Sequence, residues 1–124
     1  MMPTTLSNIG HTWLVDLDGT LTEHNAHLRG GDVLLPEVQS FWEQIPPTDA
    51  ILILTARESI HREATESFLK TQGLRYDALI MDLPKGERIL INDRKPDGLA
   101  MAVAVNLQRN AGFGEVLASI KFDS

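Results

Sequence analysis

Short apolar runs alternate along the chain with segments whose apolar residues recur at helical spacing. Residues 13–17 form a compact apolar run that ends before Gly19, and residues 50–54 form a second run without polar alternation. Runs of this kind are typical of strands covered on both faces. Shorter apolar runs predict further strands at residues 78–81, 89–91 and 103–105.

Helices are predicted between these runs. Residues 36–45 have Pro36 in the first turn, Pro46-Pro47 after the last turn, and apolar side chains at helical spacing: Val38, Phe41, Trp42 and Ile45. Residues 58–72 end before Gly73, a C-cap residue, and are expected to bury one side made of Ile60, Ala64, Ser67 and Phe68. A weaker pattern predicts a third helix at residues 114–121. Strands that alternate with helices predict an α/β sandwich around a mostly parallel sheet.

The composition narrows the classes of partner. The net charge is −6, from 11 Lys+Arg against 17 Asp+Glu, which disfavours non-specific binding to nucleic acid or to an anionic membrane. The absence of cysteine excludes disulfides and thiolate chemistry. No signal-like start or apolar run of about 20 residues is present, so a cytoplasmic protein is expected. The histidines show no metal-ligand spacing: His11, His24, His27 and His61.

The first candidate site follows the first apolar run, where Asp16, Asp18, Gly19 and Thr20 lie close together. Ligands of parallel sheets bind outside the carboxyl ends of the strands. Gly19 is expected to turn the chain, so that the two carboxylates flank a bound group and the N–H groups of the turn cradle an anion. One carboxylate can attack while the other handles the proton of the leaving group. The alternative is a solvated Asp-Gly turn.

Two further candidate sites follow later runs. Thr55-Ala56-Arg57 ends the second run. Thr55 either donates to a phosphate oxygen or caps the next helix, and Arg57 is either a substrate contact or a surface ion pair. Asp93 and Asp97 supply the hard oxygen ligands that Mg²⁺ prefers, or else belong to a polar turn.

Lys85 lies in the turn-forming segment Leu-Pro-Lys-Gly. A lysine beside a phosphate neutralises the transferring group, and an exposed turn lysine is the alternative. Only seven residues separate Lys85 from Asp93, whereas a parallel crossover needs about a dozen. Spacing alone therefore predicts a hairpin over residues 78–92, with Lys85 at its turn.

These motifs resemble those of the haloacid dehalogenase (HAD) superfamily of phosphatases and phosphotransferases. The first motif matches in full at residues 16–20, and the other three match in the family's order at Thr55, at Lys85, and at Asp93 with Asp97. The resemblance covers most of the chain and is strongest to small capsule-polysaccharide-type phosphatases.

The resemblance implies a three-layer Rossmann-like fold, with helices on both faces of the sheet, one domain over residues 1–124 and no cap domain. It implies that Asp16 is the nucleophile, that Asp18 is the general acid/base and that Thr20 orients Asp18. The remaining implied roles are phosphoryl or substrate binding by Gly19, Thr55, Ala56, Arg57 and Lys85, and Mg²⁺ binding by Asp16, Asp18, Asp93 and Asp97.

The expected function is hydrolysis of a phosphate monoester through an aspartyl-phosphate, with Mg²⁺ as cofactor and a sugar phosphate or related small metabolite as substrate. Residues 21–35 and 57–77 leave room for a loop and a helix rather than a cap, so the site should be open, and a homo-oligomer would close it. The alternatives are a phosphotransferase or mutase, and a non-catalytic module that binds phosphate or Mg²⁺.

Overall fold

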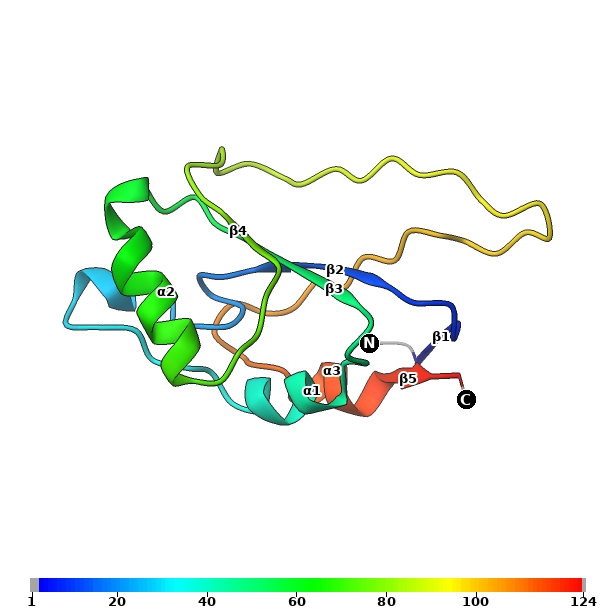
Figure 1. Ribbon diagram of the computed structural model, residues 1–124, viewed down its shortest axis with the longest axis horizontal. Helices are drawn as coiled ribbons and strands as arrows, with labels where there is room; N and C mark the ends of the chain where they lie inside the picture. Colours follow the sequence, from blue (N-terminus) through cyan, green and yellow to red (C-terminus); the bar gives the residue numbers. More distant parts are fainter. Residues whose placement is uncertain (1–2, 124) are drawn as a thin grey trace.

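The computed structural model describes residues 3–123. Strands and helices alternate along the chain, with a short 3-10 turn after β2 and another after β3 (Figure 1). Their bounds are β1 (Thr4–Leu6), β2 (Thr12–Asp16), η1 (Ala26–Leu28), α1 (Val38–Gln44), β3 (Ala50–Leu54), η2 (Ser59–His61), α2 (Arg62–Thr71), β4 (Ala78–Ile80), α3 (Gly114–Ser119) and β5 (Ile120–Phe122).

The main sheet has the strand order β2-β3-β4, and all its pairs are parallel. Trp13 lies opposite Ile51, and Val15 lies opposite Ile53, which in turn lies opposite Leu79. A second, two-stranded parallel sheet joins β1 to β5 near the chain ends. The prediction of an α/β fold with parallel strands is therefore confirmed.

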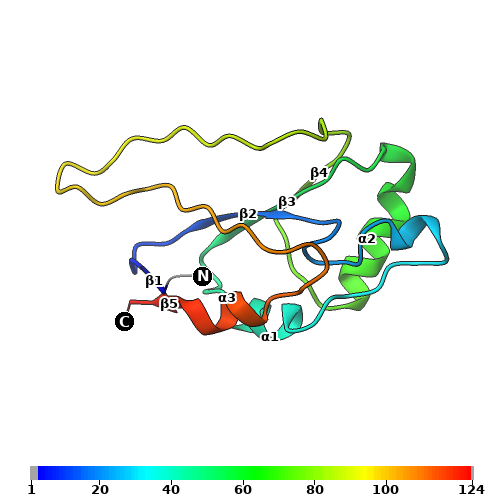
Figure 2. The ribbon, with the colours of Figure 1, turned by 180° about the vertical axis from the view of Figure 1, so that it is seen from behind.

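One face of the main sheet carries the core. Val15, Ile53 and Leu79 lie side by side in one register row, and Ile51 lies on the same face, two residues before Ile53. All four side chains are buried. Helix side chains complete the same cluster, among them Phe41 from α1, Leu69 from α2 and Val116 from α3. In Figures 1 and 2, α1 and α3 lie on the same side of the sheet.

The other face of the main sheet has no helical layer among residues 3–123. Strand side chains alternate between the faces, so Leu14, Leu52, Leu54 and Ile80 point away from the core. Leu14 is 47% exposed and Ile80 is 38% exposed. The implied third layer, with helices on both faces, is thus not formed in this structure, because the chain after β4 is extended rather than helical.

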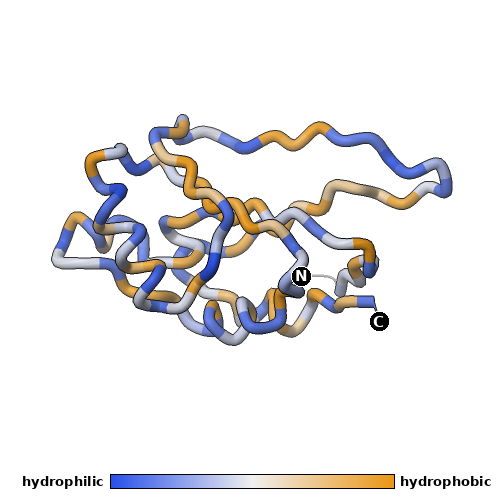
Figure 3. The backbone as a smooth tube through the Cα atoms, viewed as in Figure 1, coloured by the Kyte–Doolittle hydropathy of each residue, from blue (hydrophilic) through white to orange (hydrophobic). Residues whose placement is uncertain are grey.

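Residues 85–105, here called the arm, contain neither a helix nor a strand. An isolated antiparallel bridge between Arg94 and Ala100 closes its turn. Figures 1 and 2 show the arm running out beyond β1 and back, and Figure 3 shows apolar stretches on both of its limbs. Ile89 is 79% exposed and Ile91 is 90% exposed. The strands predicted at 89–91 and 103–105 are therefore absent, because no neighbouring strand pairs with these segments.

The helix predictions hold in position, but the buried side predicted for the second helix is wrong. The helix expected over 36–45 is α1, and its predicted inward side chains are all buried. The helix expected over 58–72 forms as η2 followed by α2. Of its predicted buried side, Ile60, Ala64 and Ser67 are exposed and Phe68 is half-buried, whereas α2 buries Thr65 and Leu69. The 3-10 turn rotates Ile60 away from this face, and the buried face of α2 is shifted by one residue from the predicted one. The helix expected over 114–121 ends at Ser119, where β5 begins.

Within residues 3–123, no helix has both the length and the apolar character needed to cross a bilayer.

Candidate active site

Asp16 is the last residue of β2, and its carboxylate is 37% exposed at the carboxyl end of the parallel sheet. Its Oδ2 accepts a hydrogen bond from Thr20 Oγ1 at 2.8 Å. Its Oδ1 accepts one from Arg88 Nη1 at 2.7 Å. Thr20, expected to orient Asp18, therefore orients Asp16 in this structure.

The turn after Asp16 is closed by its own backbone. The N–H groups of residues 20–22 all donate to Leu17 O, at 2.9–3.3 Å, and Gly19 N donates to Thr22 O at 2.7 Å. These N–H groups are consequently not free to cradle an anion. Gly19 has φ +85°, so the turn favours glycine for its conformation, and the Arg109 side chain packs closely over it, with Cγ 3.2 Å from where a Cβ would lie.

Asp18 faces the ends of both β2 and β3. Thr55 Oγ1 donates to Asp18 Oδ2 at 3.0 Å and accepts from Arg57 N at 3.0 Å. Thr55 is fully buried, so its hydroxyl holds Asp18 rather than an exposed phosphate. Ala56, between them, is half-buried.

Arg57 is buried, and protein oxygens accept from each of its three nitrogens. Its Nε donates to both oxygens of Asp18 at 3.1 and 3.2 Å, and its Nη2 donates to Asp18 Oδ1 at 2.9 Å. The two Nη atoms also donate to Asp32 at 2.6 and 3.0 Å, and Nη1 donates to Thr65 Oγ1 at 2.9 Å. A guanidinium has five N–H donors, and these contacts use all of them. Arg57 therefore has no donor left for a substrate in this arrangement.

The charges of Asp18 and Arg57 shift each other's pKa values. Burial alone raises the pKa of Asp18, but hydrogen bonds and the charge of Arg57 outweigh it, so the pKa of Asp18 lies below its usual value. Burial lowers the pKa of Arg57, but Asp32 and Asp18 outweigh it and raise that pKa. Asp18 and Arg57 are thus both ionised at neutral pH.

Two histidines complete this side of the site. His27 Nδ1 lies 3.6 Å from Asp18 Oδ1, and the His27 and His61 rings meet edge to face with centroids 5.1 Å apart. Burial, followed by the charge of Arg57, lowers the pKa of His27. The His27 ring is therefore uncharged at pH 7, where it lies beside Asp18.

The remaining predicted residues lie on the arm: Lys85, Asp93 and Asp97. Lys85 is exposed, and Arg88 rather than Lys85 contacts Asp16. Asp93 Oδ1 accepts from the adjacent Asn92, and Asp97 Oδ1 accepts from Leu99 N in the turn of the arm. That turn lies at the opposite end of the molecule from the carboxyl end of β2 (Figures 1 and 2).

The predicted metal ligands are not brought together. Among residues 3–123, no three His, Asp or Glu side chains are grouped so that they could hold a metal ion. The structure brings Asp16, Asp18, Thr20, Thr55 and Arg57 together and leaves Asp93 and Asp97 apart from them. Asp16 and Asp18 remain the oxygen donors that a hard cation would use.

Sequence reasoning missed the partners that lie far away along the chain. These are Asp32 on Arg57, Arg88 on Asp16, His27 beside Asp18, and Arg109 over Gly19. Asp32 follows Gly30-Gly31, so its only local signal was a turn. Each contact depends on tertiary folding and leaves no spacing pattern in the sequence.

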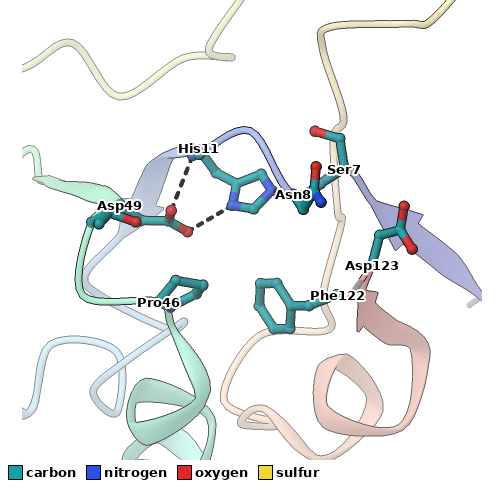
Figure 4. A pocket seen from close by; sticks show the side chains of 9 residues that line it. Ser7, Asn8, His11, Pro46, Asp49, Phe122 and Asp123 are labelled. Atoms are coloured by element: carbon teal, nitrogen blue, oxygen red, sulfur yellow. Dashed lines mark hydrogen bonds and ion pairs between the residues drawn. The ribbon is translucent and has the colours of Figure 1, made fainter.

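A separate polar cluster lies near the start of the strands (Figure 4). His11 Nδ1 and Asp49 Oδ2 are 2.7 Å apart, and His11 Nε2 lies 2.7 Å from Ser7 O. Trp13 Nε1 also donates to Asp49 Oδ2, at 2.9 Å. His11 and Asp49 line a small pocket with Pro46 and Phe122, and none of the predicted site residues lines it. Its contacts fasten the loop before β2 to the loop before β3.

Comparisons with known proteins do not assign the chain to a family. No family model matches it, and no curated protein matches it. Two solved structures are similar. A chain of the Pnkp1/Rnl/Hen1 complex is 30% identical over 64% of this chain, with a TM-score of 0.48. A chain of the Pnkp1/Rnl/Hen1 RNA repair complex is 30% identical over 63%, with a TM-score of 0.47. This chain covers only 30% and 27% of those chains, and at these TM-scores the likeness carries no assignment of fold or activity.

Proposed function

We propose that the chain is a Mg²⁺-dependent phosphatase of the HAD type, which hydrolyses a phosphate monoester through an aspartyl-phosphate on Asp16. One observation carries the proposal. A partly exposed carboxylate, Asp16, ends a strand of a parallel sheet, and a second carboxylate, Asp18, is fixed two residues later by Thr55 and Arg57. Ligands of such sheets bind at this edge.

The reaction follows from these two carboxylates. Asp16 attacks the phosphorus in line, and the bond from phosphorus to the ester oxygen breaks. Asp18 is ionised in the free protein, so its carboxylate takes up a proton from solvent before this step and gives it to the leaving oxygen. Water then attacks the phosphorus of the aspartyl-phosphate, the bond from phosphorus to the Asp16 oxygen breaks, one proton of the water passes to Asp18, and inorganic phosphate leaves. Splitting one displacement into two is the use of covalent catalysis, and positioning supplies most of the acceleration.

The donor chemistry of Asp16 and Asp18 suits Mg²⁺, which takes hard oxygen ligands and often only one or two protein carboxylates. When bound, the ion would offset the repulsion between the anionic ester and the attacking carboxylate. By the family resemblance, Asp93 and Asp97 complete the set.

Asp93 reaches Asp16 only if the arm moves. Among residues 3–123, β2 pairs with β3 alone, so its other edge has no strand partner. Residues 89–91 are apolar, largely exposed and directly before Asp93. Parallel pairing of this segment with the free edge of β2 would bring Asp93 to the end of the sheet where Asp16 lies. We include this pairing in the proposal.

Arg88 takes the place that the resemblance gives to Lys85. Its guanidinium lies 2.7 Å from the nucleophile and suits the planar, bidentate binding of a phosphate. In the absence of substrate, Arg88 forms an ion pair with Asp16. A bound phosphate monoester would be a second anionic partner for Arg88.

The proposed substrate is a small phosphorylated molecule such as a sugar phosphate. The acidic chain, with a net charge of −6, argues against nucleic-acid ends. Among residues 3–123 no separate cap covers Asp16, whose side chain is 37% exposed, and we propose that a second copy of the chain limits access to the site.

A non-catalytic phosphate- or metal-binding module is the competing function. It is favoured by one observation: both oxygens of Asp16 already have protein partners, Thr20 and Arg88. Such a module would bind Mg²⁺ or phosphate without turnover.

An assay with an aryl phosphate, with and without Mg²⁺, separates the two. Aryl leaving groups need no proton, so the ionised form of Asp18 does not limit the first step. We expect Mg²⁺-dependent turnover, and loss of about 10³-fold or more in Asp16→Asn with an unchanged melting temperature. The surface variant Glu43→Gln is the control. Wild-type protein without turnover, or full activity in Asp16→Asn, would refute the proposal.

A further inference from the structure

Asp32 is a buried carboxylate for which the proposed reaction gives no role. Its side chain is 6% exposed, on the loop that follows the Asp16–Thr20 motif. Its two oxygens accept from the two Nη atoms of Arg57, at 2.6 and 3.0 Å. Two such bonds fix the plane of a guanidinium, which a single bond does not.

The other edge of the same guanidinium holds Asp18. Nε lies 3.1 and 3.2 Å from the two Asp18 oxygens, and Nη2 lies 2.9 Å from Oδ1. Because the guanidinium is planar and rigid, the Asp32 contact determines where these donors point. Thr55 supplies a further hydrogen bond to the Asp18 carboxylate. The orientation of Asp18 is therefore set jointly by Thr55 and by a residue on a distant loop.

The loop that carries Asp32 is itself anchored by backbone contacts. Glu23 N donates to Val33 O at 2.9 Å, and Leu35 N donates to Leu21 O at 2.9 Å. Thr22 and Leu34 form an antiparallel bridge. Asp32 thus projects from a braced pair of segments, so its position does not depend on Arg57 alone.

We propose that Asp32 is a positioning residue, which acts through Arg57 to hold Asp18 in the orientation needed for proton transfer. The inference rests on the proposed phosphatase reaction. Asp32 contacts Arg57 and not the substrate, so its loss should affect turnover more than substrate affinity. Without Asp32, the Arg57 guanidinium keeps Thr65 and Asp18 but is free to tilt, and Asp18 tilts with it.

Kinetics of Asp32→Asn test the inference with an aryl phosphate and Mg²⁺, a substrate that needs Asp18 only as the base that takes the proton of water in the second step. A small displacement of a catalytic group costs about 10²-fold, so we expect kcat to fall by about that factor with KM within about threefold of wild type. Glu23→Gln is the matched control, because Glu23 lies on the same loop and loses the same charge, yet its side chain pairs with the exposed Arg29 and not with Arg57. It should retain wild-type kcat. A kcat within twofold of wild type in Asp32→Asn overturns the inference, as does an equal loss in both variants.

Nuclear magnetic resonance of the Arg57 Nε–H supplies a readout without turnover. In the wild-type protein it should exchange with water more than about tenfold more slowly than the exposed Arg29 Nε–H, and Asp32→Asn should shift its resonance and speed its exchange. Wild-type exchange as fast as that of Arg29 overturns the inference even if Asp32→Asn does not fold. If the wild-type protein shows a protected Arg57 but no turnover, the proposed function fails and the positioning contact itself stands.

Discussion

At the scale of single residues, the cation that contacts Asp16 is Arg88 and not Lys85, the cation that the resemblance predicts. Arg88 contacts Asp16, whereas Lys85, three residues earlier, is exposed. If the neutralising group is the one that touches the nucleophile, Arg88→Gln should lower kcat/KM for an aryl phosphate by about 10²-fold. Lys85→Gln should change it by less than about threefold. Steady-state kinetics of the two variants measure the difference, and a larger loss in Lys85→Gln would assign the role to Lys85.

Asp49 is a residue whose contribution is to stability. It is 3% exposed and accepts hydrogen bonds from His11 and Trp13. Burial raises the pKa of Asp49, but these hydrogen bonds and the charge of His11 outweigh it, so the pKa lies below its ordinary value of 3.8. A carboxyl with a lowered folded-state pKa stabilises the fold above its unfolded-state pKa, and this stabilisation is lost as the pH falls through the folded-state value.

Asp49→Asn should therefore lower the free energy of unfolding by about 2 kcal/mol near neutral pH. The difference from wild type should persist down to about pH 5 and shrink between about pH 4 and pH 2. Urea unfolding at a series of pH values measures it, with Glu43→Gln on the exposed side of α1 as the control. A difference that grows on acidification would contradict the assignment.

At the scale of elements, the sequence predicted what local patterns determine. Unbroken apolar runs located β2 and β3, and helical spacing located α1 with its buried side chains. The short β1 and β5 were missed, because three-residue strands have no pattern of their own and depend on each other for pairing. The same reasoning placed Asp16, Asp18 and Thr55 at one edge of the sheet. It did not find Asp32 or Arg88, whose contacts join segments far apart in the sequence.

The arm is the element where local pattern and described structure disagree. Residues 89–91 and 103–105 have the apolar composition of strands, yet Ile91 is 90% exposed. Strand composition stabilises only when a neighbour supplies hydrogen bonds and packing. The free edge of β2 is such a neighbour, and pairing there would bring Asp93 toward Asp16.

Hydrogen–deuterium exchange measures whether this pairing occurs. We expect Mg²⁺ with a phosphate mimic to slow exchange of the amides of residues 89–91 by about tenfold or more. Asp93→Asn should abolish this protection, whereas Asp97→Asn, in the turn of the arm, should weaken it less. Exchange that is unchanged by Mg²⁺ in the wild-type protein would show that the arm does not dock, and Asp93 would lose its proposed role as a ligand.

At the scale of the whole molecule, the uncovered face of the sheet and the open site are the same surface. Asp16, Leu54 and Ile80 lie in one register row, and Leu14 and Leu52 lie in the next. Asp16 therefore projects from the face that carries exposed apolar side chains. Apolar patches on such faces commonly mark interaction sites, and a partner bound here would also cover Asp16.

This geometry predicts a dimer through that face. Because Leu14 is 47% exposed at its centre, Leu14→Glu should convert a concentration-dependent dimer into a monomer in sedimentation velocity. Ile60→Glu is the matched control, since Ile60 is 83% exposed on η2 and should leave the dimer intact. If the second copy also closes the site, Leu14→Glu should raise KM for a small phosphate ester more than it lowers kcat, because Asp16 and Asp18 keep their own contacts in the monomer. A wild-type chain that sediments as a monomer at every concentration would leave the site open and contradict this prediction.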